Sequence, residues 1–309
     1  MMGSVVSVNS ALRKGEAKSP VLEGTLRAGY GLEGDAHAGG SRQVSLLARE
    51  AVDSCASTEL RMELKPGDFG ENITTLGIDL ASLCVGERLM VGPEAILQIS
   101  EIGKMCTAPC SIGKRLGECI MPKKGLFAKV VRGGRLAPGD SVGRTTLKAG
   151  AVLTASDRCA RGERRDESGP LLVGLLREIG VALADHSVLA DDENGLTEKL
   201  EFLADRCAVD VILTTGGTGF GPRDRMPEAT LSAIETQAAG IAEAIRQEGM
   251  RHTPMACLSR GVSGLRGRTL IVNLAGSERA VAESMDLLRA VLPHALEVLR
   301  SEVTDCGGC

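Results

Sequence analysis

A run of glycines in the second half of the chain has the composition of an anion-binding loop. The apolar stretch VDVILTT, residues 209–215, leads directly into GGTGFGPRD at residues 216–224. Glycines at the end of a parallel strand let backbone N–H groups come close to an anion. The pattern is neither a Walker A loop nor a GxGxxG fingerprint, because no Gly-Lys-Ser/Thr follows and the glycine spacing differs. It predicts a phosphate site at Gly216, Gly217, Thr218, Gly219 and Arg223, with a plain glycine-rich turn as the alternative.

Polar residues follow other apolar stretches in the same half of the chain. A serine after NLAG, residues 273–276, is placed to cap the next helix, whose N-terminus favours an anion. Acidic residues open two earlier helices, and Mg²⁺ needs carboxylates at such places when it bridges a protein to nucleotide phosphates. Each of these residues would also suit a simple helix cap. The candidate ligand residues are Ser156, Asp166, Ser168, Gly276 and Ser277, beside the acidic stretch DDE at residues 191–193.

Thiols and positive charge coincide in the first half. Between residues 102 and 135 there are eight lysines and arginines against one acid, and Cys106, Cys110 and Cys119 lie among them. Positive charge stabilises a thiolate and attracts phosphorylated ligands. The segment therefore predicts a nucleophilic or persulfide-carrying cysteine. A solvated basic edge with incidental cysteines is the alternative.

Cysteines also occur outside this segment. A zinc site built on the clustered thiols would need His37 or the terminal pair, Cys306 and Cys309, as a further ligand. That pair lies in a glycine-rich tail, where a frayed end is the simplest interpretation. The isolated cysteines are predicted to be buried as small hydrophobic side chains; they are Cys55, Cys84, Cys159, Cys207 and Cys257.

Composition excludes several classes of protein. With 309 residues, 43% of them hydrophobic, 25% charged and a net charge of -4, the chain is long enough for two globular domains. Only 2% of the residues are aromatic and none is Trp, which excludes a base-stacking platform for nucleic acid. No apolar run approaches the ~18 residues of a spanning helix. We therefore expect a cytoplasmic protein that binds neither nucleic acid nor membranes.

The rhythm of the expected elements changes near residue 148. Up to that point, short β-prone runs alternate with glycine-rich turns, which predicts a mostly antiparallel β-barrel over residues 1–148, with one short helix near residues 49–57. From residue 149 to 309, apolar strands alternate with amphipathic helices, which is typical of an α/β domain with a mainly parallel sheet.

The motifs of the second region resemble the molybdopterin adenylyltransferase family. They are AVLTASDRC, GERRDESGP, TTGGTGFGPRD, PEAT, SRG and TLIVNLAGS, and they span nearly all of residues 150–300. The resemblance implies a three-layer α/β fold, a homotrimer, and transfer of the AMP part of Mg-ATP to the terminal phosphate of molybdopterin. It implies Asp192 and Asp224 as the essential acids and magnesium ligands. It also places Ser156, Gly216, Gly217, Thr218, Gly219 and Ser277 in ligand-binding motifs.

Two residues depart from that family's pattern. Met226 stands where Thr is usual before the Pro of PEAT, and Ala275 stands where Pro is usual in NLPGS. Met226 lacks a hydroxyl near the expected phosphate loop. This favours an alternative in which the protein binds, stores or delivers the cofactor without turnover.

The first region resembles the MOSC domain, a module found at the carboxyl end of molybdenum-cofactor sulfurases. The motifs are GLEGDAHAGGSRQVSLLA, GDFGENITTLGIDL, VGERLMVG, APC and GLFAKVVRGGRLAPGD, over roughly residues 3–145. The resemblance implies that Cys110 carries sulfur or the cofactor. Thr107 replaces the usual basic residue before the Pro-Cys pair, so we expect Lys104 or Lys114 to bind the anion.

Two modules linked to one cofactor predict a role in molybdenum-cofactor biosynthesis or maturation. The expected ligands are molybdopterin or the molybdenum cofactor, ATP and Mg²⁺, and the expected partners are a molybdoenzyme or a sulfur donor. An oxidoreductase that uses bound cofactor through Cys110 is a third possibility.

Overall fold

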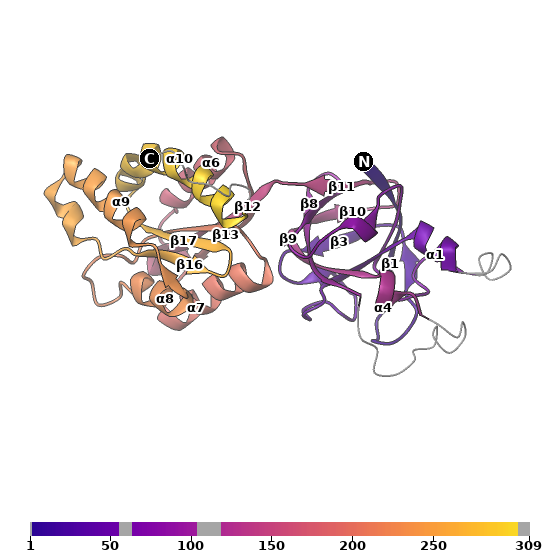
Figure 1. Ribbon diagram of the computed structural model, residues 1–309. Helices are drawn as coiled ribbons and strands as arrows, with labels where there is room; N and C mark the ends of the chain where they lie inside the picture. Colours follow the sequence, from indigo (N-terminus) through magenta and orange to yellow (C-terminus); the bar gives the residue numbers. More distant parts are fainter. Residues whose placement is uncertain (1, 56–63, 104–118, 302–309) are drawn as a thin grey trace. The chain divides into compact units, whose positions relative to one another are not determined.

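The protein consists of two compact units, residues 1–146 and 147–309. The computed structural model, drawn in Figure 1, describes residues 2–55, 64–103 and 119–301. The division falls two residues before the expected one, because the strand that opens the second unit already begins at Lys148. Each unit has its own hydrophobic core, and each is described separately below.

The first unit is a closed seven-stranded barrel. Its strands run in the order β11-β7-β8-β9-β5-β6-β1, and β11 pairs with β1 to close the sheet. All neighbours are antiparallel except β5 and β6, so the predicted barrel is confirmed. The bounds are β1 Met2–Ser10, β5 Val44–Ala48, β6 Ile73–Leu76, β7 Arg88–Val91, β8 Ala95–Ile102, β9 Leu126–Arg132 and β11 Ser141–Thr145.

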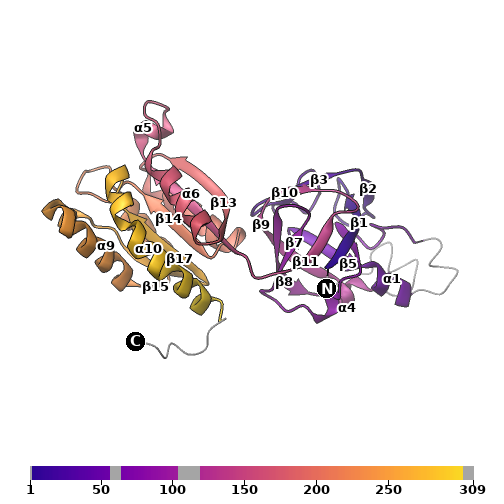
Figure 2. The same ribbon diagram turned by 90° about the horizontal axis from the view of Figure 1, so that it is seen from above.

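Alternating apolar residues fill the barrel. On β7 and β8, for example, Leu89, Val91, Leu97 and Ile99 are fully buried, as expected where every second side chain points inward. The remaining elements are β2 Ser19–Val21 beside β1, a small sheet of β10, β3 and β4, and the helices α1 and α4 (Figure 2). Their bounds are β3 Gly24–Arg27, β4 Gly31–Leu32, β10 Gly134–Leu136, α1 Arg49–Cys55 and α4 Met121–Lys124, with a 3₁₀ turn at Leu80–Ser82.

The second unit is built on a six-stranded mixed sheet. The order is β13-β12-β14-β17-β16-β15; the first four strands are parallel and the last two antiparallel. The bounds are β12 Lys148–Ala155, β13 Val181–Leu189, β14 Val211–Thr215, β15 Thr236–Gln237, β16 Ser263–Arg266 and β17 Thr269–Leu274. Because β12, β14 and β17 are almost wholly buried and apolar, their sequences read as continuous hydrophobic runs.

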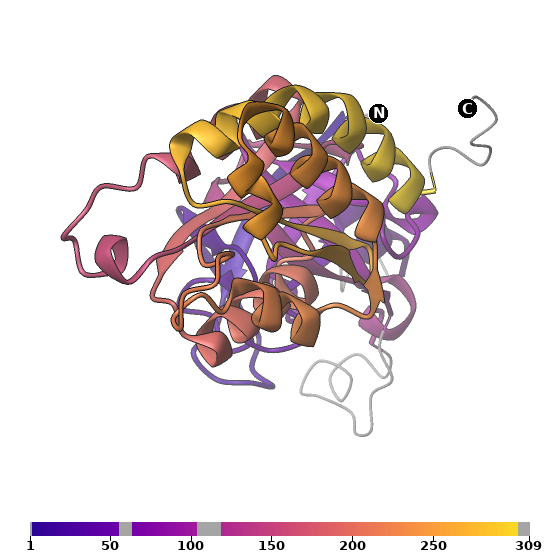
Figure 3. The same cartoon turned by 90° about the vertical axis from the view of Figure 1, so that its left-hand side faces the viewer.

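Helices cover both faces of this sheet, as Figure 3 shows. On one face, apolar side chains of α6, α9 and α10 pack against β12, β14 and β17; α7 and α8 pack together on the other. The bounds are α5 Asp157–Ala160, α6 Ser168–Glu178, α7 Glu193–Glu201, α8 Met226–Ala233, α9 Ala239–His252 and α10 Glu278–Leu299, with a π-helical turn at Phe202–Arg206 and a 3₁₀ turn at Pro254–Leu258.

The amino-terminal edge of the parallel strands is held by a buried carboxylate. Asp210, which precedes β14, accepts a hydrogen bond from the backbone N–H of Ala149 at 2.7 Å and one from Arg300 at 3.3 Å. Its own N–H and C=O bond to Ala149 and Leu270. One residue thus joins three strands and the end of α10.

The isolated cysteines do not share one environment. Cys207 is buried as predicted, but Cys84 and Cys257 are exposed. The prediction was wrong for these two because Cys84 lies in the turn before β7 and Cys257 in a short surface 3₁₀ turn. It was also wrong for Cys159, which is half-buried because it lines a cavity. Within the described ranges, no helix has the length and hydropathy needed to cross a membrane.

Candidate functional site

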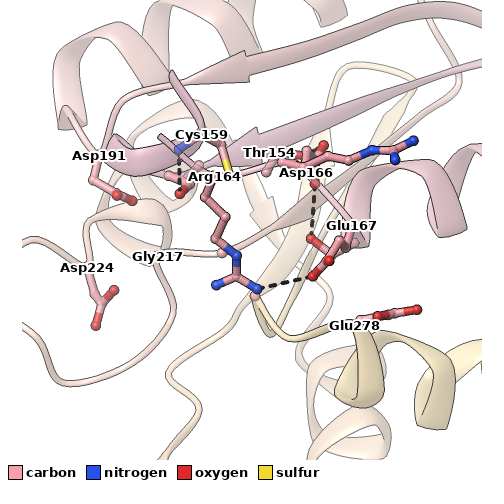
Figure 4. Close-up of a pocket in the computed structure, with 15 residues that line it drawn as sticks. Thr154, Cys159, Arg164, Asp166, Glu167, Asp191, Gly217, Asp224 and Glu278 are labelled. Carbon is pink, nitrogen blue, oxygen red and sulfur yellow. Dashed lines mark hydrogen bonds and ion pairs between the residues drawn. The ribbon is translucent and has the colours of Figure 1, made fainter. Parts of the chain in front are cut away.

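A cavity of about 230 Å³ opens at the carboxyl-terminal edge of the second unit's sheet (Figure 4). Its lining comes from the last residues of β12 and from the segments that follow β12, β13, β14 and β17. Because these four strands are parallel, their carboxyl ends meet at one edge, where ligands of open α/β folds bind. The topology therefore brings together loops that are more than 100 residues apart in the chain.

Many predicted site residues meet in this cavity. Those that line it are Ser156, Asp166, Ser168, Gly216, Gly217, Asp224 and Gly276. The predicted residues in neighbouring positions that do not line it are Asp192, Thr218, Gly219, Arg223 and Ser277. The lining residues that were not predicted as site residues are Thr154, Ala155, Cys159, Arg164, Arg165, Glu167, Asp191 and Glu278. Most of these residues are next to a predicted site residue in the sequence, and that adjacency is the signal that could have identified them.

The glycine loop lies tightly against the end of β12. Gly216 has a φ of +92°, and a Cβ atom there would come within 2.2 Å of the carbonyl oxygen of Ala155. A Cβ on Gly276 would come within 3.0 Å of the Gly216 Cα, so the two predicted anion loops touch. Glycine is therefore required at both positions for the loops to approach each other and the strand.

Three consecutive backbone amides of this loop are available to a ligand. The N–H groups of Gly217, Thr218 and Gly219 have no hydrogen-bond partner in the part of the chain that the structure describes. The carbonyl groups of the same residues, in contrast, accept bonds from Met226 N and from Arg260. A loop whose carbonyls are satisfied and whose amides are not is suited to bind an anion.

The carboxylate of Asp191 lies next to the glycine loop. Its Oδ2 atom accepts a hydrogen bond from the Asp157 N–H at 2.9 Å. Its Oδ1 atom is buried, has no hydrogen-bond partner among the described residues, and lies 3.0 Å from the Cβ position of Gly217. Burial is the largest influence on the pKa of Asp191 and raises it; the charges of Asp157 and Asp224 raise it further.

Asp192, the acid expected at the site, has a different position. It is exposed, and its Oδ2 atom accepts a hydrogen bond from the Gly195 N–H at 2.8 Å, which caps the start of α7. Asp192 therefore has the role of a helix cap, which was the alternative for these acids, whereas its neighbour Asp191 lines the cavity.

Asp224 lies on the glycine loop and also lines the cavity. Its Oδ2 atom accepts a hydrogen bond from the Gly221 N–H at 2.8 Å. The preceding residue, Arg223, donates two hydrogen bonds to Asp157, at 3.0 and 2.8 Å, and these are the main cause of the lowered pKa of Asp157. Arg223 thus ties the glycine loop to α5.

Asp166 is surrounded by donors. It accepts hydrogen bonds from Thr154 Oγ1 at 2.8 Å and Gly169 N at 2.9 Å, and His186 Nε2 lies 3.2 Å away. Burial alone would raise the pKa of Asp166, but these hydrogen bonds outweigh it and lower the pKa. With both oxygens engaged, this carboxylate shapes the entry into α6.

Arg260 holds the glycine loop through hydrogen bonds to its carbonyl groups. Its guanidinium donates to the carbonyl oxygens of Gly219 and Asp224, each at 2.7 Å, and forms an ion pair with Glu228 of α8. Its backbone N–H donates to Thr218 O at 2.9 Å. Although SRG was among the recognised motifs, no local pattern placed Arg260 against a loop about 40 residues away.

Most of the predicted cysteine site of the first unit lies outside the described residues, although Cys119 is described and half-buried. The residues that lie outside are Cys110, Cys106, Lys104 and Lys114, and also the terminal Cys306 and Cys309. Among the described residues, no group of three or more His, Cys, Asp or Glu side chains could hold a metal ion.

The GDAH stretch at residues 34–37, part of the first MOSC-like motif, is described and contains one partner of a buried ion pair. Lys18 Nζ donates to both oxygens of Asp35, at 2.9 and 2.8 Å, and neither side chain is more than 1% exposed. Asp35 also accepts from the N–H groups of Ala11 and His37. Burial alone would raise the pKa of Asp35, but hydrogen bonds from His37 and Lys18 hold it far below its usual value.

Comparison with known proteins gives matches over both units. The family described as a probable molybdopterin binding domain matches residues 151–294, and the MOSC domain matches residues 33–143. The chain is 34% identical over 150 residues to a molybdopterin adenylyltransferase of Helicobacter pylori, covering 48% of this chain and 85% of that protein.

Two longer relatives are covered only in part. The molybdenum cofactor biosynthesis bifunctional protein of Synechococcus elongatus is 35% identical over 217 residues, which are 69% of this chain and 66% of that protein. The molybdenum cofactor synthesis protein cinnamon of Drosophila melanogaster is 41% identical over 157 residues, which are 50% of this chain and only 26% of that protein.

Proposed function

The chain belongs to the molybdopterin-binding domain family and carries a MOSC domain ahead of it, and on this premise we propose that its second unit is a molybdopterin adenylyltransferase. In this reaction an oxygen of the terminal phosphate of molybdopterin attacks the α-phosphorus of ATP. The bond from that phosphorus to the bridging oxygen breaks, and pyrophosphate leaves. The observation that carries the proposal is the set of three unpartnered loop amides beside the buried Oδ1 atom of Asp191.

The residues at this place fit a magnesium ion. Mg²⁺ is usually held by one or two carboxylates together with substrate phosphates, and the unpartnered Asp191 Oδ1 and the nearby carboxylate of Asp224 supply such a pair. When bound, the ion would neutralise charge on the phosphates during transfer. The role that the resemblance implied for Asp192 passes in this proposal to Asp191, since Asp192 is engaged as a helix cap.

The other loop residues act on the substrates directly. The amides of Gly217, Thr218 and Gly219 bind phosphate oxygens and orient them. Arg223 and Arg260 keep the loop in position through Asp157 and through the carbonyls of Gly219 and Asp224. Because these donors are in place before the reaction, they stabilise developing negative charge at little reorganisation cost.

The test is release of pyrophosphate from ATP on addition of molybdopterin, with two matched variants. Asp191→Asn removes one charge from the cavity and should lower the rate on the order of a hundredfold or more. Asp192→Asn has the same chemistry one residue away and should retain most of the rate. The opposite result would return the role to Asp192. If molybdopterin binds but no pyrophosphate forms in the wild type, the protein binds or delivers the cofactor without turnover.

For the first unit we propose that Cys110 carries sulfur or the cofactor, with Lys104 or Lys114 binding an anionic group; the support is the MOSC family match. A molybdoenzyme or a sulfur donor would be the partner, and the chain would work as a homotrimer in the cytoplasm. Mass spectrometry after exposure to a persulfide donor should find added sulfur on Cys110. The exposed Cys84 serves as the control thiol, and equal labelling of both would contradict the assignment.

A further inference from the structure

The cavity carries an excess of negative charge. Its lining includes five carboxylates and two guanidinium groups. The carboxylates are Asp166, Glu167, Asp191, Asp224 and Glu278, and the cations are Arg164 and Arg165. A phosphorylated ligand would therefore be repelled unless cations meet it. One magnesium ion compensates only part of this charge, so the position of the two arginines matters.

Both arginines lie between α5 and α6, on the wall of the cavity that the segment after β12 forms. Figure 4 shows the Arg164 side chain reaching toward Glu167. The distance between their charged groups is 3.4 Å, and the two side chains are 50% and 53% exposed. Such an exposed pair contributes little free energy and exchanges partners easily.

Arg165 has fewer polar contacts than Arg164. It has neither a hydrogen bond nor an ion pair with any residue in the described part of the chain. Two other arginines of this region are paired with protein carboxylates: Arg161 donates two hydrogen bonds to Glu163, and Arg223 donates two to Asp157. Neither arginine of the cavity wall therefore makes a strong contact that would stabilise the fold, and both are available to a ligand.

We propose that Arg164 and Arg165 form a phosphate clamp that determines which ligand the cavity accepts. The glycine loop binds one phosphate group with its amides, and the arginine wall binds a second. The planar guanidinium group suits this task because it can donate two parallel hydrogen bonds to a phosphate. The clamp rests on the proposed function. Its phosphate belongs either to the β- and γ-positions of ATP or to the terminal phosphate of molybdopterin.

The experiment measures dissociation constants by isothermal titration calorimetry for Mg-ATP, for AMP and for molybdopterin. The variants are Arg164→Gln, Arg165→Gln and the double variant. Arg161→Gln is the matched control, since it lies in the same loop but outside the cavity lining. Each clamp variant should weaken its ligand by about tenfold, which corresponds to one lost charge-assisted contact. Arg165→Lys should restore only part of the affinity because lysine lacks the fork.

The pattern of losses identifies the phosphate. Weaker Mg-ATP binding with unchanged AMP binding would assign the clamp to the β- and γ-phosphates, and weaker molybdopterin binding alone would assign it to the pterin. If the clamp variants bind all three ligands as tightly as Arg161→Gln does, the clamp is wrong.

The same titrations separate the clamp from the reaction. Wild-type pyrophosphate release without any loss of affinity in the variants overturns the clamp and leaves the transferase standing. Reduced affinity in the variants without pyrophosphate release in the wild type overturns the transferase and leaves the clamp. A wild type that binds none of the ligands contradicts both.

Discussion

At the scale of single residues, Glu71 is an almost fully buried acid with one unpartnered oxygen atom in the part of the barrel that the structure describes. It is 1% exposed; its Oε1 atom accepts hydrogen bonds from Gly67 N at 2.7 Å and Thr74 Oγ1 at 2.8 Å, while Oε2 has no hydrogen-bond partner among the described residues. Burial raises the pKa of Glu71 above its usual value of 4.5, although these hydrogen bonds oppose the shift. The folded barrel therefore favours the protonated acid.

This shift predicts how the stability of the barrel depends on pH. Because the pKa is higher in the folded than in the unfolded state, the contribution of Glu71 is fully present below about pH 4.5 and is lost as the pH rises through the folded-state pKa. Glu71→Gln should remove this loss. Tyr30, the only tyrosine in a chain without Trp, lies in the first unit, so its fluorescence reports barrel unfolding in urea. Equal pH dependence in both proteins would refute the prediction.

At the scale of elements, the glycine loop lies so close to β12 that a larger residue in it should reduce both ligand binding and stability. Gly216→Ala places a Cβ 2.2 Å from the Ala155 carbonyl and requires a positive φ. We expect loss of Mg-ATP binding and a lower melting temperature. Gly162→Ala is the control: its φ is +72° but its Cβ would meet nothing within 4 Å, so it should cost only about 1–2 kcal/mol of left-handed strain and leave binding intact. Retained binding in Gly216→Ala would show that the loop can move away.

Arg260 supports the opposite side of the same loop. Arg260→Ala leaves the carbonyls of Gly219 and Asp224 without their donor. A displaced Asp224 should reduce pyrophosphate release by about tenfold to a hundredfold, since small misplacements are costly in group transfer. Arg260→Lys should recover the contact with Glu228 but not both carbonyl bonds, and so recover part of the rate. An Arg260→Ala enzyme with unchanged kcat and KM would reduce the residue to a structural role.

The elements themselves were largely predictable from the sequence, because each has a strong local signature. The glycine-punctuated β runs predicted the barrel, and continuous apolar runs between amphipathic stretches predicted the parallel strands. Which of Asp191 and Asp192 lines the cavity was not predictable. It depends on which side chain the turn after β13 directs into the cavity and which one caps α7, and neighbouring identical residues give no such signal. The contact of Arg260 with a distant loop likewise requires the tertiary fold.

At the scale of the whole molecule, the two cores predict two unfolding events. Each unit has its own apolar cluster, and only Thr146 and Leu147 separate β11 from β12. Mg-ATP at a hundred times its dissociation constant should stabilise the second unit by about 2.7 kcal/mol. Calorimetry should show that transition moving to higher temperature while the Tyr30 transition of the barrel stays in place. A matching shift of the Tyr30 signal would mean that the two units unfold together.

The four parallel strands of the second unit give its sheet two unlike ends. The carboxyl end holds the cavity with its unpartnered amides and carboxylate, whereas at the amino end Asp210 is fully bonded to Ala149, Leu270 and Arg300. A library of random substitutions, sorted separately for folding and for turnover, should therefore divide along the strand axis. Variants near Asp210 would be lost in the folding screen, and many variants at the cavity would pass it and fail only in turnover. In this protein, tolerance of the fold to mutation and the capacity to change activity would then depend on opposite ends of the same strands.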